Sequence, residues 1–127
     1  MAENRIEQYL IDLKYSYSEV KPNIWLLDDD EHDLEGVVVM YDDPLVIIRM
    51  QVMNVPKENK LDFFTKLLEL NACDMIHGAY GLEGDKIVII DTLEYETMDY
   101  TEFRASLDAI SLALAQHYQT LSAYREK

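Results

Sequence analysis

The sequence has few of the residues that disulfide or polyanion chemistry requires. It contains one cysteine, Cys73, so no disulfide can form within the chain. It has 11 Lys and Arg against 25 Asp and Glu, which gives a net charge of −14. Binding to a nucleic-acid backbone or to an anionic membrane surface needs clustered cations. We therefore expect no nucleic acid and no membrane among its partners.

Long hydrophobic runs are also missing. The chain has no stretch of roughly 18 consecutive apolar residues, and its first residues, MAENRIEQYL, lack the pattern of an export signal. These absences favour a soluble, cytoplasmic protein. The chain is 127 residues long and 49% apolar, which is enough to bury a core. We expect one domain over residues 1–127.

The hydrophobic periodicity predicts three helices. The first is a narrow apolar stripe over Glu3–Tyr15. The second begins after Pro56 and has an unusually wide apolar arc, which exceeds what one sheet face would cover. The third opens at Asp99, where Glu102 completes the spacing of a capping box, and extends to about Tyr124.

Five strands are predicted between these helices. Turn residues separate short runs that are rich in β-branched side chains. The element order is α-β-β-β-α-β-β-α, which predicts an α+β domain with an antiparallel sheet and helices packed on it. The strands are expected at Ile24–Leu27, Val37–Tyr41, Leu45–Val55, Gly78–Leu82 and Ile87–Ile90. The pattern leaves open which of four apolar strand residues face water: Val37, Val39, Ile47 and Met53.

The acidic run Asp28–Glu35 is the one candidate for a cation site. Six of its eight residues are carboxylates, the ligands that hard cations prefer. It does not fit a calcium-binding EF-hand loop, because Asp33 stands where glycine is needed and Val39 where glutamate is needed. We expect a solvated loop, since closely spaced like charges repel one another.

No other group of residues has a catalytic pattern. Cys73 and His77 are four residues apart, but they lie where a helix must end, so their side chains need not meet. The ordinary role of such a cysteine is as a small residue at the end of a helix or in the core. His32 and His117 are isolated in the sequence. We expect no catalytic residues, no metal site and no cofactor.

One segment resembles a known family. The stretch Leu67–Ile90, LLELNACDMIHGAYGLEGDKIVII, is similar to the helix-Asn, strand, Gly-Leu-acid turn, strand signature of type III secretion chaperone-like (Tir chaperone) proteins and of YbjN-like domains. The matching positions are Leu67, Leu68, Asn71, Gly78, Gly81, Leu82, Asp85 and Ile87–Ile90. The amide of Asn71 suits a helix end, because it can pair with backbone groups that a leucine would leave unsatisfied.

The resemblance implies a function without catalysis. Chaperones of this family are small, acidic, cytoplasmic and typically homodimeric, and they hold an effector segment against apolar patches. YbjN-like members are instead described as regulators of sensory transduction. In the family the second helix helps to form the dimer interface, so the resemblance makes candidates of Phe63, Phe64, Leu67, Leu68 and Leu70. An alternative is that all five lie in the core of one chain.

We therefore expect a non-enzymatic binding protein that forms a homodimer and holds or regulates a protein partner. Neither the partner nor the residues that bind it can be identified from the sequence. Two alternatives stay open. The first is a signalling or regulatory module that has no client protein and works through a small ligand or through dimer contacts. The second is a metal-assisted enzyme that would use Asp28, Asp30 and Asp33.

Overall fold

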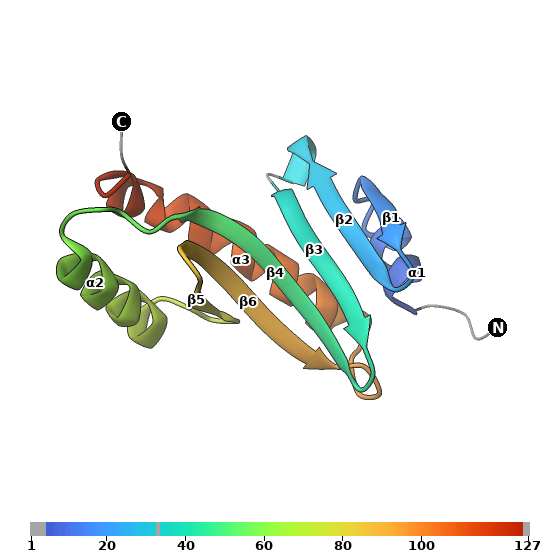
Figure 1. Ribbon diagram of the computed structural model, residues 1–127. Helices are drawn as coiled ribbons and strands as arrows, with labels where there is room; N and C mark the ends of the chain where they lie inside the picture. Colours follow the sequence, from blue (N-terminus) through green and yellow to red (C-terminus); the bar gives the residue numbers. More distant parts are fainter. Residues whose placement is uncertain (1–4, 33, 126–127) are drawn as a thin grey trace.

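The computed structural model describes residues 5–32 and 34–125. Within these residues, six strands form one antiparallel sheet with the order β1-β2-β3-β4-β6-β5 (Figure 1). The elements are α1 (Arg5–Asp12), β1 (Tyr17–Lys21), β2 (Ile24–Asp29), the 3-10 helix η1 (Asp30–His32), β3 (Leu34–Asp42), β4 (Leu45–Asn54), α2 (Lys60–Cys73), β5 (Ala79–Glu83), β6 (Lys86–Glu94) and α3 (Tyr100–Ser122).

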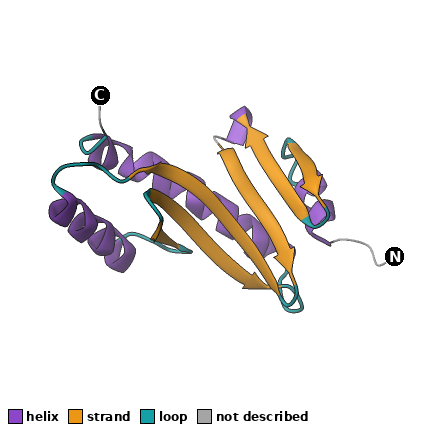
Figure 2. Ribbon diagram, in the orientation of Figure 1, coloured by secondary structure: helices purple, strands orange, loops and turns teal. Residues whose placement is uncertain are grey.

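The predicted fold class is confirmed: the chain is a single α+β domain in which three α-helices accompany an antiparallel sheet (Figure 2). The prediction missed β1, so the structure has six strands where five were expected. In Tyr17–Lys21 four of the five residues are exposed, and only Tyr17 and Val20 are apolar. Such an edge strand has no periodic signal to detect.

One helix boundary also differs from the sequence prediction. The first helix ends at Asp12 instead of Tyr15, because Lys14 adopts a left-handed conformation with φ of 63°. Its expected start at Glu3 lies outside the described residues. The capping box at Asp99 and Glu102 is confirmed, since each side chain bonds to the backbone N–H of the other.

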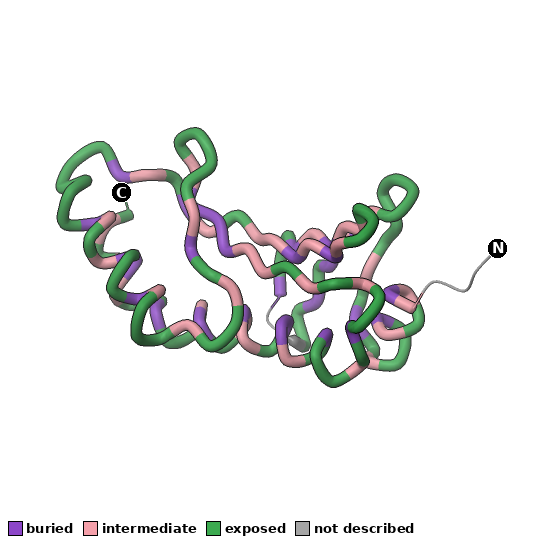
Figure 3. The backbone as a smooth tube through the Cα atoms, turned by 90° about the horizontal axis from the view of Figure 1, so that it is seen from below, coloured by how far each residue is buried: buried purple, intermediate pink, exposed green. Residues whose placement is uncertain are grey.

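The sheet and the helices form two layers (Figure 3). In Figure 1, α3 and α1 both lie behind the sheet. We call the covered side the inner face. Its apolar side chains pack with Ile6 and Leu10 of α1 and with Phe103, Leu107 and Ile110 of α3. The buried apolar residues of the inner face are Trp25, Leu27, Leu34, Val37, Val39, Val46, Ile48, Met53, Tyr80, Ile87 and Ile89.

The second helix has a different position. It lies at one end of the sheet, next to the edge strand β5 (Figure 1).

The hairpin that joins β5 to β6 turns at Gly84, whose φ of +61° is a conformation that glycine adopts readily. This turn was expected from the sequence.

Within the described part of the chain, none of the helices has the length and apolarity that crossing a bilayer requires.

Neighbouring residues of β4 provide a test of this layering. Ile48 lies on the inner face and is fully buried, whereas Ile47 points to the opposite face and is half-buried. We expect Ile48→Ala to lower the free energy of unfolding by about 2–4 kcal/mol, because it leaves a cavity in the core. The matched control Ile47→Ala should cost less than about half as much. Urea unfolding followed by circular dichroism measures both, and equal losses would contradict the layering.

Candidate partner-binding surface

The side of the sheet that faces away from α1 and α3, which we call the outer face, is also apolar. The strand registers place Leu26 opposite Val38, and Ile24 opposite Met40. The same registers continue across the sheet, where Met40 pairs with Ile47. The apolar outer-face residues are Ile24, Leu26, Val38, Met40, Leu45, Ile47, Val88 and Ile90. They extend across four strands, and the polar Arg49, Gln51 and Thr92 share the same face: Arg49 lies between Val38 and Ile90, and Gln51 lies next to Val88.

No described helix covers this surface, which faces the viewer in Figure 1. Among the eight apolar residues only Val88 is buried, and the other seven are half-buried by their neighbours in the sheet. None of the eight belongs to the core cluster or packs against it. The structure thus answers the question that the sequence left open: Val37, Val39 and Met53 are buried on the inner face, and Ile47 lies on the outer face.

Acidic side chains stand at both ends of the outer face. Asp28 and Glu35 are cross-strand neighbours at the end where β2 passes into β3. At the other end, Asp42 and Glu94 flank Leu45 in the strand register. Asp28 and Glu35 lie directly opposite each other and repel, whereas Asp42 and Glu94 are separated by the strand that carries Leu45. Both ends of the apolar surface are therefore negatively charged.

A second apolar surface lies between α2 and β5. It is a groove of about 260 Å³, lined almost entirely by apolar side chains. Leu68 and Leu82 border it and are 68% and 59% exposed. Its lining residues are Phe64, Leu67, Leu68, Asn71, Tyr80, Gly81, Leu82 and Ile87. We call this surface the α2–β5 groove.

The five residues predicted for the dimer interface do not share one environment. Phe63 is completely buried, and Leu67 and Leu70 are also buried within the chain. Phe64 is half-buried at the groove, and Leu68 is exposed. The wide apolar arc of this helix therefore divides into a stripe that packs inward and a stripe that stays accessible. Only Phe64 and Leu68 could contribute substantially to contact with another molecule.

A polar network holds α2, β5 and α3 together. The side-chain amide of Asn71 donates to the carbonyl oxygen of Tyr80 at 3.1 Å, and the N–H of Tyr80 donates to Oδ1 of Asn71 at 2.7 Å. The pairing role expected for this helix-end amide is confirmed. Asn71 thereby occupies the outward backbone groups of Tyr80, which would otherwise be open to another strand.

Tyr80 extends the network to α3. Its hydroxyl lies 2.7 Å from Nδ1 of the buried His117. Burial raises the pKa of Tyr80 to about 12, so at neutral pH the hydroxyl keeps its proton and can donate to Nδ1. The other ring nitrogen, Nε2, then carries the imidazole proton and lies 3.7 Å from a carboxylate oxygen of Asp74. The sequence did not predict this network, because the partners of His117 lie far from it along the chain.

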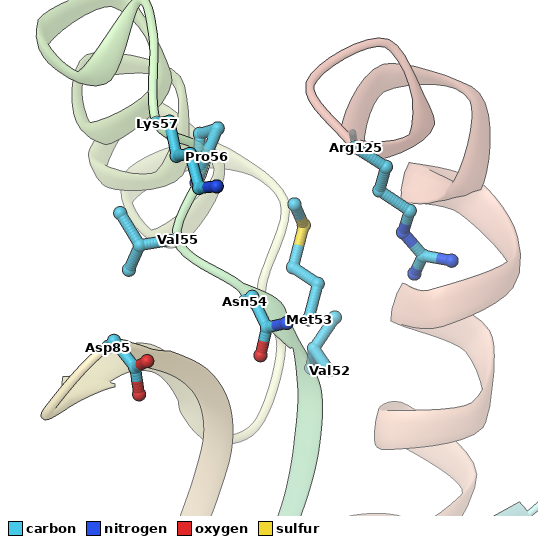
Figure 4. Close-up of a pocket in the computed structure, with 8 residues that line it drawn as sticks. All are labelled: Val52, Met53, Asn54, Val55, Pro56, Lys57, Asp85 and Arg125. Atoms are coloured by element: carbon cyan, nitrogen blue, oxygen red, sulfur yellow. The ribbon is translucent and has the colours of Figure 1, made fainter. Parts of the chain in front are cut away.

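A larger cavity lies elsewhere, between the end of β4 and the residues that follow α3 (Figure 4). Its volume is about 520 Å³. Val52 and Val55 contribute apolar walls, while Arg125 points toward the gap from the end of α3 (Figure 4). The complete lining is Val52, Met53, Asn54, Val55, Pro56, Lys57, Asp85 and Arg125. This mixture of apolar and charged groups is typical of a surface cleft.

The acidic run does not converge on one point. The carboxylate of Asp28 accepts the N–H of Gly36 at 2.8 Å, and buried Asp29 accepts the N–H of Ser16 at 2.7 Å. Asp30 is exposed in η1, and Asp33 lies outside the described residues. Across residues 5–32 and 34–125, no group of three or more His, Cys, Asp or Glu side chains could hold a metal ion.

The pair formed by Cys73 and His77 is not assembled either. Cys73 is the last residue of α2 and is exposed, so of the two expected places, a helix end or the core, it occupies the helix end. His77 is exposed in the loop before β5. In the described part of the chain no hydrogen bond joins these two side chains.

His117 should make stability depend on pH. Burial lowers the pKa of His117 below its ordinary value of 6.5, although the carboxylate of Asp74 opposes the shift. In the unfolded chain the imidazole takes up a proton near pH 6.5, so the unfolded state binds more protons as the pH falls. The free energy of unfolding should decrease below pH 6.5 and stop responding to His117 once the pH is below the folded-state pKa.

The control is His117→Asn, which keeps a hydrogen-bonding group near the position of Nδ1 but does not titrate. Urea unfolding between about pH 7.5 and 5.5 should give a smaller pH slope for the variant than for the wild type. Identical slopes would show that His117 is not held neutral in the folded state.

Comparison with known proteins agrees with this architecture. Residues 2–127 match the CesT_Tir_1 family, a family of type III secretion chaperones. The crystal structure of YbjN from E. coli, which has been proposed to be a transcription regulator, is similar with a TM-score of 0.67 and 19% identity. The similarity covers 92% of this chain and 91% of YbjN. No curated protein matches the sequence. The chain belongs to the CesT_Tir_1 family and has a YbjN-like fold.

Proposed function

We propose that this protein is a cytoplasmic, non-enzymatic binding protein that forms a homodimer and holds a segment of another protein. Family membership supports the coarse statement that it has a chaperone-like, protein-binding role. The observation that carries the finer proposal is the apolar outer face, which no described helix covers. An apolar surface of this extent, bordered by charge, is the usual mark of an interaction site.

The two apolar surfaces suit different roles. The outer face is broad and lies on the rigid sheet, so it can accept a partner without rearrangement of the chain. The α2–β5 groove is narrower and presents the exposed Leu68 beside the half-buried Phe64. A second copy that inserted its own Leu68 into this groove would bury both leucines in a self-complementary contact. We assign the homodimer to the groove and the partner to the outer face.

The net charge of −14 fits this division. Like-charged molecules resist random association, which keeps a protein with exposed apolar surfaces soluble. The same charge disfavours nucleic acid and anionic membranes as partners. A regulatory role like that proposed for YbjN would then act through protein contacts.

A regulatory module without a client protein is the second candidate. The cavity of about 520 Å³ favours it, because apolar walls with a few charged groups are typical of small-ligand sites. This candidate would gain support if the protein were a dimer whose outer face contacted no other protein.

The dimer assignment is tested at Leu68. Light scattering of the purified protein at tens of micromolar should give about twice the chain mass of 14.8 kDa. Leu68→Asp should give the monomer mass, because a carboxylate in the groove would be buried against its copy. Leu112→Asp on α3 is the matched control: Leu112 is also exposed, at 46%, but lies outside the groove. A monomeric wild type would refute the assignment.

The partner assignment is tested by a photo-crosslinking amino acid placed at Ile47. In cells of the source organism, this position should give discrete adducts that mass spectrometry identifies as one or a few proteins, because Ile47 is at the centre of the outer face. The same amino acid at Leu112 should give none, since that position is on the opposite side of the molecule. Equal labelling from both positions, or none from Ile47, would argue against partner binding on the outer face.

A further inference from the structure

The outer face has a shape and a charge pattern that restrict what can cover it. We propose that its occupant is an amphipathic helix of a partner protein, with an apolar stripe along its length and Lys or Arg at both ends. This inference rests on the proposed function and specifies the chemistry of the partner. Three features support it. An extended segment would bury backbone N–H and C=O groups without hydrogen-bond partners, the outer face has carboxylates at both of its ends, and the distance between these ends suits a helix of ordinary length.

The backbone argument favours a helix. The outer face presents side chains, because the backbone N–H and C=O groups of β2, β3, β4 and β6 are used in pairing within the sheet. An extended segment laid across Val38, Ile47 and Ile90 would bury its own backbone groups against apolar side chains, at a cost of about 1–3 kcal/mol for each unpaired group. A helix satisfies its backbone internally and can bury a stripe of side chains.

The alternative of strand addition needs a free sheet edge instead of a face. At the β5 edge, Asn71 already pairs with both backbone groups of Tyr80. The β1 edge lies at the far side of the sheet and is formed by a strand whose residues are mostly exposed and polar. Strand addition at either edge would leave the apolar outer face uncovered.

The charge argument sets the ends of the helix. Asp28 and Glu35 lie at one end of the apolar surface, and Asp42 and Glu94 lie at the other. The nearest cation within the apolar surface, Arg49, is already paired with Glu83. Lys21 lies across from Ile24 at the β1 edge, and among the described residues neither it nor any other cation forms an ion pair with these four carboxylates. Basic residues at both ends of an incoming helix would therefore meet carboxylates that the described part of the chain does not neutralise. The same carboxylates would repel a second copy of this chain, whose net charge is also −14.

The spacing argument sets the length. Glu35 and Asp42 are seven residues apart on β3, which corresponds to about 23 Å at about 3.3 Å per strand residue. A helix that rises about 1.5 Å per residue spans this distance in about 15 residues. The helix α3, which covers the inner face of the same sheet, has 23 residues. A helix of ordinary length can therefore reach both acidic ends while its apolar stripe covers the strands between them.

The test uses three synthetic peptides and fluorescence anisotropy. One is an amphipathic helix of about 16 residues with two lysines at each end, and the second has glutamates at those ends. The third keeps the lysine ends but alternates valine and threonine, so that it is extended. The Lys-ended helix should bind at least about tenfold more tightly than either of the others at roughly 50 mM salt. At roughly 300 mM its advantage over the Glu-ended helix should shrink, whereas its advantage over the extended peptide, which has the same charges, should remain.

Protein variants locate the site. Ile47→Asp should abolish binding of the Lys-ended helix, and the milder Ile47→Thr should weaken it if the aspartate variant fails to fold. Leu68→Asp and Leu112→Asp should have no effect. Glu35→Gln combined with Glu94→Gln should weaken binding about three- to tenfold, because it removes one carboxylate from each end. The matched control is Glu58→Gln with Glu69→Gln, which makes the same charge change near α2 and should bind as the wild type does.

The outcomes separate this inference from the proposed function. If the extended or Glu-ended peptide binds at Ile47 as tightly as the Lys-ended helix, the outer face is a protein-binding site and the inference of a basic helix is wrong. If the Lys-ended helix binds but is lost in Leu68→Asp instead of Ile47→Asp, the inference is wrong as well. If no peptide binds and the photo-crosslinking amino acid at Ile47 labels no protein, the proposed function fails together with it.

Discussion

One constraint shapes this molecule: its sheet has two apolar faces, but its helices cover only one of them. The long helix α3 and the short helix α1 both pack on the inner face, where they bury side chains such as Ile48 and Ile89. The third helix, α2, lies at the β5 edge instead of on the outer face (Figure 1). The apolar side chains opposite the core therefore stay open to contact with another molecule.

The position of α2 depends on a small number of polar contacts. Asn71 joins the end of this helix to the backbone of β5, and Tyr80 continues the connection to His117 on α3. These contacts hold α2 against the sheet edge and keep the α2–β5 groove open between Phe64 and Leu82. Because the network is buried at His117, losing one member would leave other polar groups unpaired. The same polar contacts therefore set the position of the groove and hold α2 away from the outer face.

Much of the fold could be predicted from periodicity and turn chemistry, but the surfaces could not. The capping box at Asp99 and the hairpin turn at Gly84 are local signals, and both are confirmed. The strand β1 was missed because its side chains are mostly exposed and carry no alternating pattern. The alternation in β4 separates Ile47 from Ile48 but cannot say which faces a helix, because that depends on how α1 and α3 pack. The partnership of Tyr80 and His117 joins residues 37 positions apart and has no local signature.

The central claim is that the outer face is accessible in the isolated protein while the inner face is not. Methyl NMR with a soluble gadolinium relaxation agent measures this directly on adjacent residues of the same strands. The account predicts strong relaxation enhancement for the methyl groups of Ile47 and Ile90, and little for those of Ile48 and Ile89. Equal protection of all four isoleucines would mean that the outer face is already covered, and would contradict the account.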